Sequence, residues 1–248
     1  MSPADHDSER VRFSSRDEDL RIDELDPFAE LTGDGLTAAT AGLEPRNLDV
    51  DESIDVIGSG AACCVVLTGR FALTVAGPEG RSRIIGLLEE GEVLVRPTDS
   101  WAEVGPRPLP VAIEPSSVLL VPEGRLREWL SDPQLALGLY KTMARQVADR
   151  ELAIAIALEP RVERRLLLKL RQLAERFGVV TPDGIRLDLR LTHRELAGMV
   201  GAVRESVTIA LGRLADAGEI EFRNRTLLVR NAKDDDTERT GPRLARKN

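Results

Sequence analysis

The sequence predicts an α+β protein with an antiparallel β-structure in its first half, then a long helix and a winged helix-turn-helix. Short β-rich runs between turns that contain Gly, Pro and Asp occupy residues 45–120. A long helical pattern begins at Pro133, and residues 191–230 have the pattern of two short helices followed by a hairpin. Many short strands with regular turns are typical of an antiparallel barrel or sandwich.

The β-rich runs are rich in Val, Ile, Leu and Cys and end at turn residues. They are expected at Ser53–Ile57, Cys63–Leu67, Phe71–Val75, Arg83–Leu87 and Val118–Val121. A short helical stretch over Ile22–Leu36 precedes them.

Charge divides the chain near the end of the long helix. Residues 1–159 hold 15 Lys and Arg against 29 Asp and Glu, whereas residues 160–233 hold 15 against 9. An acidic body joined to a basic module indicates a regulatory part and a part that binds a polyanion. We expect a disordered tail at 1–19 and a sensor-like domain at 20–130. A dimerisation helix at 131–159 and a DNA-binding domain at 160–233 follow, and 234–248 form a second disordered tail.

Several protein classes are excluded by composition. No apolar run approaches the roughly 20 residues of a membrane span, and the polar N-terminus carries no apolar signal segment. We therefore expect a cytoplasmic protein. The sequence contains no nucleophile elbow, phosphate-binding glycine loop or metal-ligand cluster, so we expect neither an enzyme nor a bound metal or cofactor.

Cys63 and Cys64 are the two cysteines of the chain. Adjacent cysteines form neither a disulfide framework nor a spaced metal set. The first interpretation is two small buried apolar residues, and the alternative is a redox-sensing thiol.

The long helix is expected to begin at Pro133, with Asp132 as its N-cap. A narrow apolar stripe along it resembles a seam for pairing with a second helix. The alternative is a long helix packed on its own domain. The stripe consists of Leu135, Leu139, Met143, Val147, Ile154 and Leu158. Pro160 ends or kinks the helix, and a second helix is expected over Val162–Phe177, with Gly178 as its C′ residue.

The segment 191–230 predicts the functional module. Thr192 and Glu195 form a capping box that opens a helix through Met199, and Gly201 suits a tight turn. A second helix is expected over Val203–Ala215. Its inward residues are Val203, Val207, Ala210, Leu211 and Leu214, and its outward residues are Arg204, Glu205, Thr208, Ile209 and Gly212. Two strands, Ile220–Phe222 and Thr226–Val229, complete the pattern around a basic turn.

This pattern is typical of a winged helix-turn-helix, whose second helix enters the major groove of DNA. Arg204 suits guanine and Glu205 suits cytosine N4, while Ile209 suits a thymine methyl. The expected base-reading residues are Arg204, Glu205, Thr208 and Ile209. The expected backbone contacts are Thr192, His193, Arg194, Ser206, Arg223 and Arg225. The alternative is a three-helix structural or protein-interaction domain.

From Asp26 to Arg230 the sequence resembles CRP/FNR-type transcription regulators. The resemblance rests on "GSGAACCVVLTGRFAL", "EGRSRIIGLLEEGEVL", "KTMARQV" and, most specifically, "RESV" within the helix-turn-helix. It implies a cyclic-nucleotide-binding-like β-roll, a homodimer formed through the long helix, and a palindromic double-stranded operator. It also implies contact with RNA polymerase if the protein is an activator.

The roll departs from the family pattern for cyclic nucleotides. Val95 and Arg96 stand where the ribose-binding Gly-Glu pair is expected, and Arg107-Pro108 replaces the phosphate-binding Arg-Ser pair. Arginine offers no acceptor and proline no donor, so conventional cAMP binding is not expected. Two outcomes stay open: a scaffold without ligand, or a different anion, such as a cyclic dinucleotide, near Arg96, Arg107 and Arg150. With two adjacent cysteines and no histidine in the roll, an iron–sulfur cluster or a haem is not expected.

Overall fold

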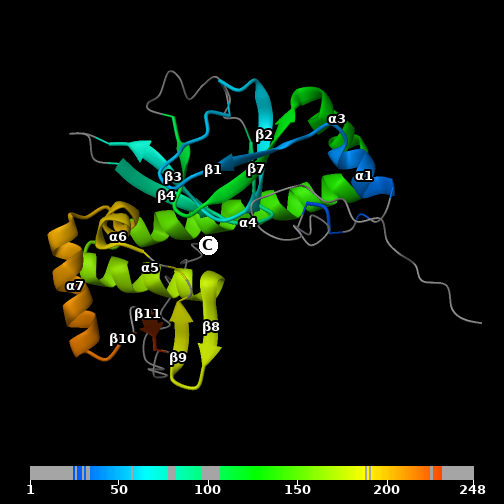
Figure 1. Ribbon diagram of the computed structural model, residues 1–248. Helices are drawn as coiled ribbons and strands as arrows, with labels where there is room; N and C mark the ends of the chain where they lie inside the picture. The colour runs from blue at the N-terminus through cyan, green and yellow to red at the C-terminus, as the bar shows by residue number, and fades with distance from the viewer. Residues whose placement is uncertain are drawn as a thin grey trace, which may run out of the picture. The chain divides into compact units, whose positions relative to one another are not determined.

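The computed structural model in Figure 1 describes residues 25, 27–29, 31, 34–56, 58–77, 82–95, 107–187, 189, 191–223 and 226–230. It divides into two compact units, Met1–Ala155 and Ile156–Asn248. The tails expected at 1–19 and 234–248 lie outside the described residues. Within the described part, no helix is both long and apolar enough to cross a membrane.

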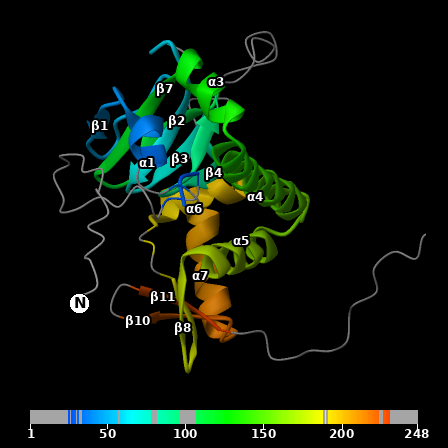
Figure 2. The same ribbon diagram turned by 90° about the vertical axis from the view of Figure 1, so that its right-hand side faces the viewer.

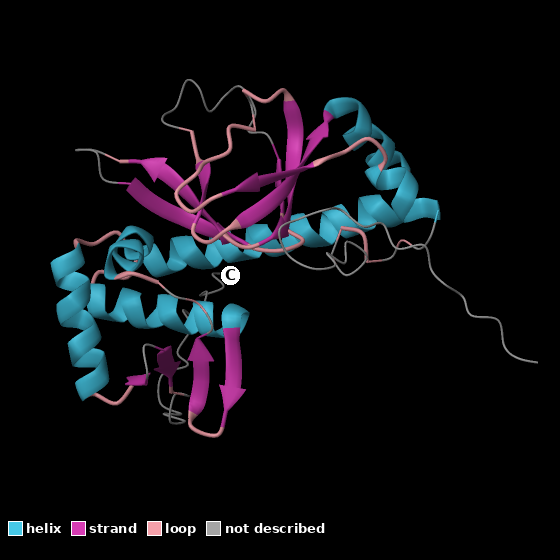
Figure 3. Ribbon diagram, in the orientation of Figure 1, coloured by secondary structure: helices cyan, strands magenta, loops and turns pink. Residues whose placement is uncertain are grey.

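The N-terminal unit is built on two antiparallel sheets (Figure 3, magenta). One sheet has the order β1-β7-β2-β5 and the other β4-β3-β6. The strands are β1 Pro45–Leu48, β2 Ala61–Thr68, β3 Phe71–Ala76, β4 Ser82–Leu88, β5 Val93–Val95, β6 Leu109–Ala112 and β7 Ser116–Pro122. We call these two sheets the roll. The antiparallel β-structure predicted for this half of the chain is confirmed.

The central strand β2 separates two hydrophobic cores. Successive side chains of a strand point to opposite faces, so Cys63 packs into one core and Cys64 into the other. Burial raises the pKa of both thiols to about 12. Redox-sensing cysteines need an accessible thiolate, so the interpretation as buried apolar residues is confirmed.

Helix α3, Glu123–Ser131, ties the start of the unit to the roll through Trp129. The indole is almost completely buried and lies edge-on to Phe28, with 5.2 Å between ring centroids. Its Nε1 donates to the carbonyl of Ala39 at 2.9 Å, at the end of helix α1, Asp34–Thr40. The helix predicted over Ile22–Leu36 is wrong at residues 27–29, which form a turn, and correct only at its end, where α1 begins at Asp34.

One predicted strand is also wrong. Within Ser53–Ile57 only Ser53 forms a β-bridge, to Val111, and Ile57 lies outside the described residues. The side chains of Ile54 and Val56 are nevertheless buried in the core. The alternation of apolar residues predicted their burial correctly. The extended backbone ends in a turn, in which the N–H of Ser59 donates to the carbonyl of Asp55.

Helix α4, Pro133–Ala157, is the predicted long helix. The carboxylate of Asp132 accepts hydrogen bonds from the backbone N–H groups of Gln134, at 2.8 Å, and Leu135, at 3.1 Å. The predicted N-cap is therefore confirmed.

The predicted seam on α4 requires a correction, because it lies on two faces of the helix. Leu135 and Leu139 are buried in the core of the roll, and Met143 packs against it. Val147 and Ile154 are 51% and 63% exposed. Residues four apart are displaced by about 40° around a helix, so the stripe passes from the buried face to the free one. The first three residues belong to the fold of the unit, as the alternative interpretation held.

The C-terminal unit contains three helices and one four-stranded antiparallel sheet of order β10-β11-β9-β8. The helices are α5 Val162–Phe177, α6 His193–Val200 and α7 Arg204–Asp216, and the strands are β8 Gly178–Thr181, β9 Gly184–Leu187, β10 Ile220–Arg223 and β11 Thr226–Val229. Figure 1 and Figure 2 show α5 and α7 crossing one another, with α6 against them.

The role expected for Gly178 is wrong, although it follows α5 as predicted. Its backbone is extended, with φ −97° and ψ 147°, and begins β8 rather than a left-handed cap. Glycine is required because a Cβ would overlap the carbonyl oxygen of Ala174 and the side chain of Ile185.

Candidate nucleic-acid interface

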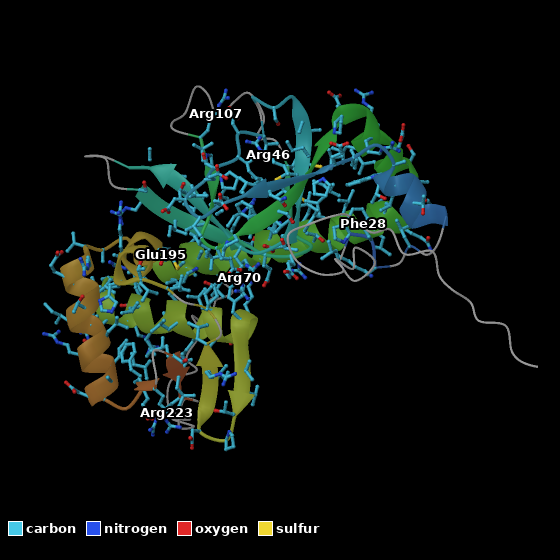
Figure 4. All side chains as sticks on the ribbon, in the orientation of Figure 1. Phe28, Arg46, Arg70, Arg107, Glu195 and Arg223 are labelled. Atoms are coloured by element: carbon cyan, nitrogen blue, oxygen red, sulfur yellow. The ribbon has the colours of Figure 1, made fainter. Side chains whose placement is uncertain are left out.

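Helix α6 has at its two ends the capping box and the glycine turn that the sequence predicted. Thr192 Oγ1 accepts from the backbone N–H of Glu195 at 3.2 Å, and the Glu195 carboxylate accepts from Thr192 N at 2.6 Å. Gly201 closes the helix in the left-handed conformation, with φ 64°. The capping box and the glycine turn are therefore confirmed, and together they set the direction in which α7 leaves (Figure 4 labels Glu195).

The inward face of α7 anchors it to the rest of the unit. Val207, Ala210, Leu211 and Leu214 are all buried, as predicted. Val203 is 41% exposed, which corrects its assignment to this face. It is the N-cap, with extended backbone (φ −91°, ψ 153°), and therefore lies outside the helical periodicity.

The outward face of α7 is open to solvent. Its residues Arg204, Glu205, Thr208, Ile209 and Gly212 are all exposed, and Ile209 is 59% exposed. The side chains of Arg204 and Glu205 make no hydrogen bond or ion pair with any residue that the structure describes. The Arg204 guanidinium, with its five N–H donors, and the neighbouring Glu205 carboxylate are therefore both available on the same face of the helix.

Thr208 and His193 are joined to each other. The Thr208 hydroxyl donates to the carbonyl of Arg204 at 3.0 Å, so it accepts from His193 Nδ1, which lies 2.9 Å away. This bond ties the start of α6 to α7. The Thr208 hydroxyl is thus engaged, and its methyl group is the part left for a base edge.

The wing, formed by β10 and β11, carries Arg223. Unlike Arg204 on α7, Arg223 forms ion pairs. Arg223 Nη1 lies 2.6 Å from Asp183 Oδ2, and its Nε lies 2.5 Å from Glu221 Oε1 (Figure 4). Arg230 also reaches Glu221, at 2.7 Å. Hydrogen bonds from these two arginines lower the pKa of the Glu221 carboxyl to about 2. The predicted phosphate ligand Arg223 is therefore already paired with carboxylates, and Arg225 lies outside the described residues.

Arg165 is a residue of the site that sequence reasoning missed. Its Nε donates to the carbonyl of Val200 at 2.8 Å, and its Nη1 donates to the carbonyl of Glu159 at the same distance. It thus holds the end of α6 against the segment that precedes α5. No local pattern marks it, because its partners are backbone carbonyls.

A groove between α5 and α7 was also missed. It encloses about 770 Å³ and is lined by Ser206 and Ile209 from α7 and by Arg161 and Arg164 at the start of α5. Both arginines are exposed, and neither side chain pairs with a described residue. Arg213, at the same groove, lies 3.7 Å from Glu163. The three arginines at this groove, Arg161, Arg164 and Arg213, extend the basic surface beside α7, but they come from two helices and share no sequence motif.

A separate hollow of about 220 Å³ lies in the N-terminal unit. Its apolar walls come from the two sheets, and its polar lining includes Arg107, Arg150 and Asp55. The structure therefore brings together two of the three predicted effector-binding arginines (Figure 4 labels Arg107), while Arg96 lies outside the described residues. Pro108 lines the same hollow and offers it no donor. Arg150 Nη2 lies 3.4 Å from Gln146 Oε1.

Comparison with known proteins gives consistent results for the C-terminal unit and for the whole chain. The model of the Crp-like helix-turn-helix domain matches residues 161–234. A CRP-like cAMP-activated global transcriptional regulator of Mycobacterium tuberculosis is 25% identical over 210 residues, which are 82% of this chain and 91% of that protein. A global nitrogen regulator of Synechocystis is 31% identical over 122 residues, 49% of this chain and 54% of that protein.

Solved structures share the fold at lower identity. A CooA variant of Carboxydothermus hydrogenoformans matches with a TM-score of 0.69 at 20% identity, over 89% of this chain and 94% of that one. The c-di-GMP-responsive regulator CLP of Xanthomonas campestris matches with a TM-score of 0.62 at 17% identity, over 79% and 98% of the chains. The relatives named here are regulators rather than enzymes.

Proposed function

We propose that this chain, which belongs to the CRP/FNR family of DNA-binding transcription regulators, acts as a homodimer that reads a palindromic operator in the cytoplasm. The observation that carries the proposal is the outward face of α7, where Arg204 and Glu205 are exposed and uncommitted on a rigidly capped helix-turn-helix. The capped helix-turn-helix fixes the backbone that carries these two side chains, so binding has to order the side chains alone.

The chemistry of this face supports a specific reading of bases. Arg204 donates its two parallel N–H groups to guanine O6 and N7, and Glu205 accepts from cytosine N4. Ile209 and the methyl group of Thr208 supply apolar contact, for which the thymine methyl is the matching group. The operator half-site therefore contains a G·C pair opposite Arg204 and an apolar contact opposite Ile209.

Backbone contacts surround this face. Thr192, His193, Arg194 and Ser206 lie on α7 or at the start of α6, and we add Arg161 and Arg164 from the groove. Phosphate contacts fix the register of the protein without reading sequence. Removal of any one of the three arginines reduces the salt dependence of binding, because each neutralises a phosphate.

The exposed face of α4 supports the dimer. Its apolar residues follow one another at intervals of three, seven, seven and four residues, which fit the heptad spacing of a paired helix. They are Leu137, Tyr140, Val147 and Ile154, from 48% to 69% exposed, followed by Leu158 at 78%. Two copies joined along this face present two α7 helices, as a palindromic operator requires.

The test is in vitro selection of a preferred duplex, followed by titration of the wild type and of Arg204→Ala. We expect the variant to lose about 1–3 kcal/mol of binding free energy per half-site, roughly five- to 150-fold in Kd for each. Arg127→Ala is the matched control, because Arg127 is an exposed arginine of the N-terminal unit, paired with Glu123. Equal Kd values for all three proteins contradict the proposal.

A second function, effector binding, is favoured by the hollow in the roll. Arg107 and Arg150 at an apolar cavity suit a small anion with an apolar body, such as an aryl carboxylate. The volume of 220 Å³ lies below the roughly 300–1,000 Å³ of pockets for larger ligands, which argues against a cyclic dinucleotide in this space. An effector would bias operator binding, and an activator would in addition contact RNA polymerase.

Thermal melts with cAMP, cyclic di-GMP and a series of aryl carboxylates test this second function. A ligand that binds the native state raises the melting temperature. We expect a rise with a carboxylate in the wild type and none in Arg107→Ala. No rise with any carboxylate contradicts it and leaves the roll as a scaffold.

A further inference from the structure

Gly212 is an unusual residue to find in α7, because it is an interior helical position without a structural need for glycine. Glycine destabilises a helix interior relative to alanine, since it loses more backbone freedom on folding. The backbone φ of Gly212 is not among the positive values of the chain, so no left-handed turn requires it. A Cβ built at Gly212 meets nothing within 4 Å.

Gly212 lies at the C-terminal end of the outward face, about 10 Å beyond Glu205 along the helix axis. At about 100° per residue it lies within about 20° of Glu205 around the helix, between Thr208 on one side and Ile209 on the other. Glycine at this point leaves bare backbone at the C-terminal end of the surface that we propose reads DNA. The fold keeps a locally unfavourable residue where only a bound partner would fill the space.

We infer that Gly212 is a point of close approach, at which the backbone of α7 lies against the sugar–phosphate wall of the major groove. Glycine permits a backbone to approach a ligand more closely than any residue with a Cβ. The inference rests on the proposed function. According to this inference, the absence of a side chain at Gly212, together with Arg204, sets the depth to which α7 enters the groove.

The chain offers an internal control for this glycine. Gly124 is an exposed residue of α3, and a Cβ there also meets nothing within 4 Å. It belongs to the N-terminal unit, away from the face of α7 that carries the proposal. Gly124→Ala therefore repeats the chemical change without touching the proposed DNA surface.

The experiment compares Gly212→Ala, Gly212→Leu and Gly124→Ala with the wild type by thermal melting and by titration of the selected duplex. Both alanine variants should melt at the wild-type temperature or a few degrees higher, because alanine favours the helix. Gly212→Ala should raise Kd for the selected duplex at least tenfold, and Gly212→Leu should raise it further. Gly124→Ala should leave Kd unchanged.

Two further readouts separate close approach from other roles. The slope of log K against log salt should be the same for Gly212→Ala and the wild type, because no ionic contact is removed. Binding to an unrelated duplex should change less than binding to the selected one, since only the selected one requires full insertion of α7.

The outcomes distinguish this inference from the proposed function. If Arg204→Ala weakens binding but Gly212→Ala does not, the close approach is wrong and the recognition face stands. If neither weakens binding, the proposed function itself fails. A Gly212→Ala protein that melts below the wild type assigns the glycine a role in folding and also overturns the inference.

Discussion

The two units of the molecule differ in where some of their polar groups lie. Those of the N-terminal unit are buried and hydrogen-bonded, and those on the outward face of α7 are exposed. In the N-terminal unit, the buried Glu92 carboxylate accepts from the backbone N–H of Glu89 at 3.0 Å, and the buried Gln146 donates to the carbonyl of Val93 at 3.0 Å. In the C-terminal unit, Arg204 and Glu205 are exposed and uncommitted among the described residues. A surface that reads a large rigid polyanion presents its groups in advance, whereas the polar groups of the roll serve mainly its own fold.

This comparison predicts that substitutions in the core of the roll change stability and that substitutions on exposed faces change binding. The exposed face of α4 is the informative exception, because it belongs to the N-terminal unit but is the surface that we propose forms the dimer.

The largest expected effect comes from that face. Val147→Asp combined with Ile154→Asp places charges on the proposed dimer interface and should give a monomer in sedimentation. Affinity for the full palindrome should fall about 100-fold or more, because the second half-site no longer adds avidity. Affinity for a single half-site should not change. A double variant that stays dimeric shows that α4 is not the interface.

The next largest effect is on folding. Leu139→Ala should lower the free energy of unfolding by about 2–5 kcal/mol, because it leaves a cavity in the core of the roll. Leu130→Ala, at a leucine that is 56% exposed, should change it by less than about 0.5 kcal/mol. Urea titration of the two variants measures the difference. Equal losses in the two would place Leu139 outside the core.

A smaller effect is expected at the cap of α6. Thr192→Ala removes the side chain that accepts from Glu195 N and should lower stability by about 1 kcal/mol. Thr192→Ser keeps the oxygen and should stay close to the wild type. If serine and alanine are equally harmful in thermal melts, the capping hydrogen bond is not the cause.

The smallest effect is expected in the wing. The pKa of Glu221 is lowered to about 2, so this carboxylate stays ionised between pH 5 and 8 and keeps its hold on Arg223. The stabilisation from this pairing is present above the ordinary pKa of 4.5 and is lost only as pH falls towards 2. Glu221→Gln should leave Arg223 paired with Asp183 alone, which makes it easier to draw to a phosphate, and raise DNA affinity up to about fivefold. Weaker binding in a titration of Glu221→Gln would mean that the carboxylate positions Arg223 for DNA.

Features that depend on neighbouring residues could be predicted from the sequence. Asp132, the Thr192–Glu195 capping box and Gly201 each act through backbone groups within five residues, and the structure has all three. The range predicted for α5 is also the observed one. Local hydrogen bonds and helical periodicity carry enough information for these features.

Features that depend on partners distant in sequence could not be predicted from the sequence. Strand β5 is three residues long and forms only against β2, and Arg165 acts on a carbonyl 35 residues away. On α4 both faces carry apolar residues, so composition alone did not show which face the roll covers. The pairing of Arg223 with Asp183 joins positions 40 residues apart, and no local pattern marks it.

The most direct test is a double-mutant cycle between Arg204 and the G·C pair assigned to it. Kd is measured for the wild type and Arg204→Ala, each on the selected operator and on one with that pair replaced in both half-sites. The base change should cost the wild type about 1–3 kcal/mol per half-site and the variant almost nothing, because the contact is already absent. Equal costs in both proteins would show that Arg204 does not read that base pair.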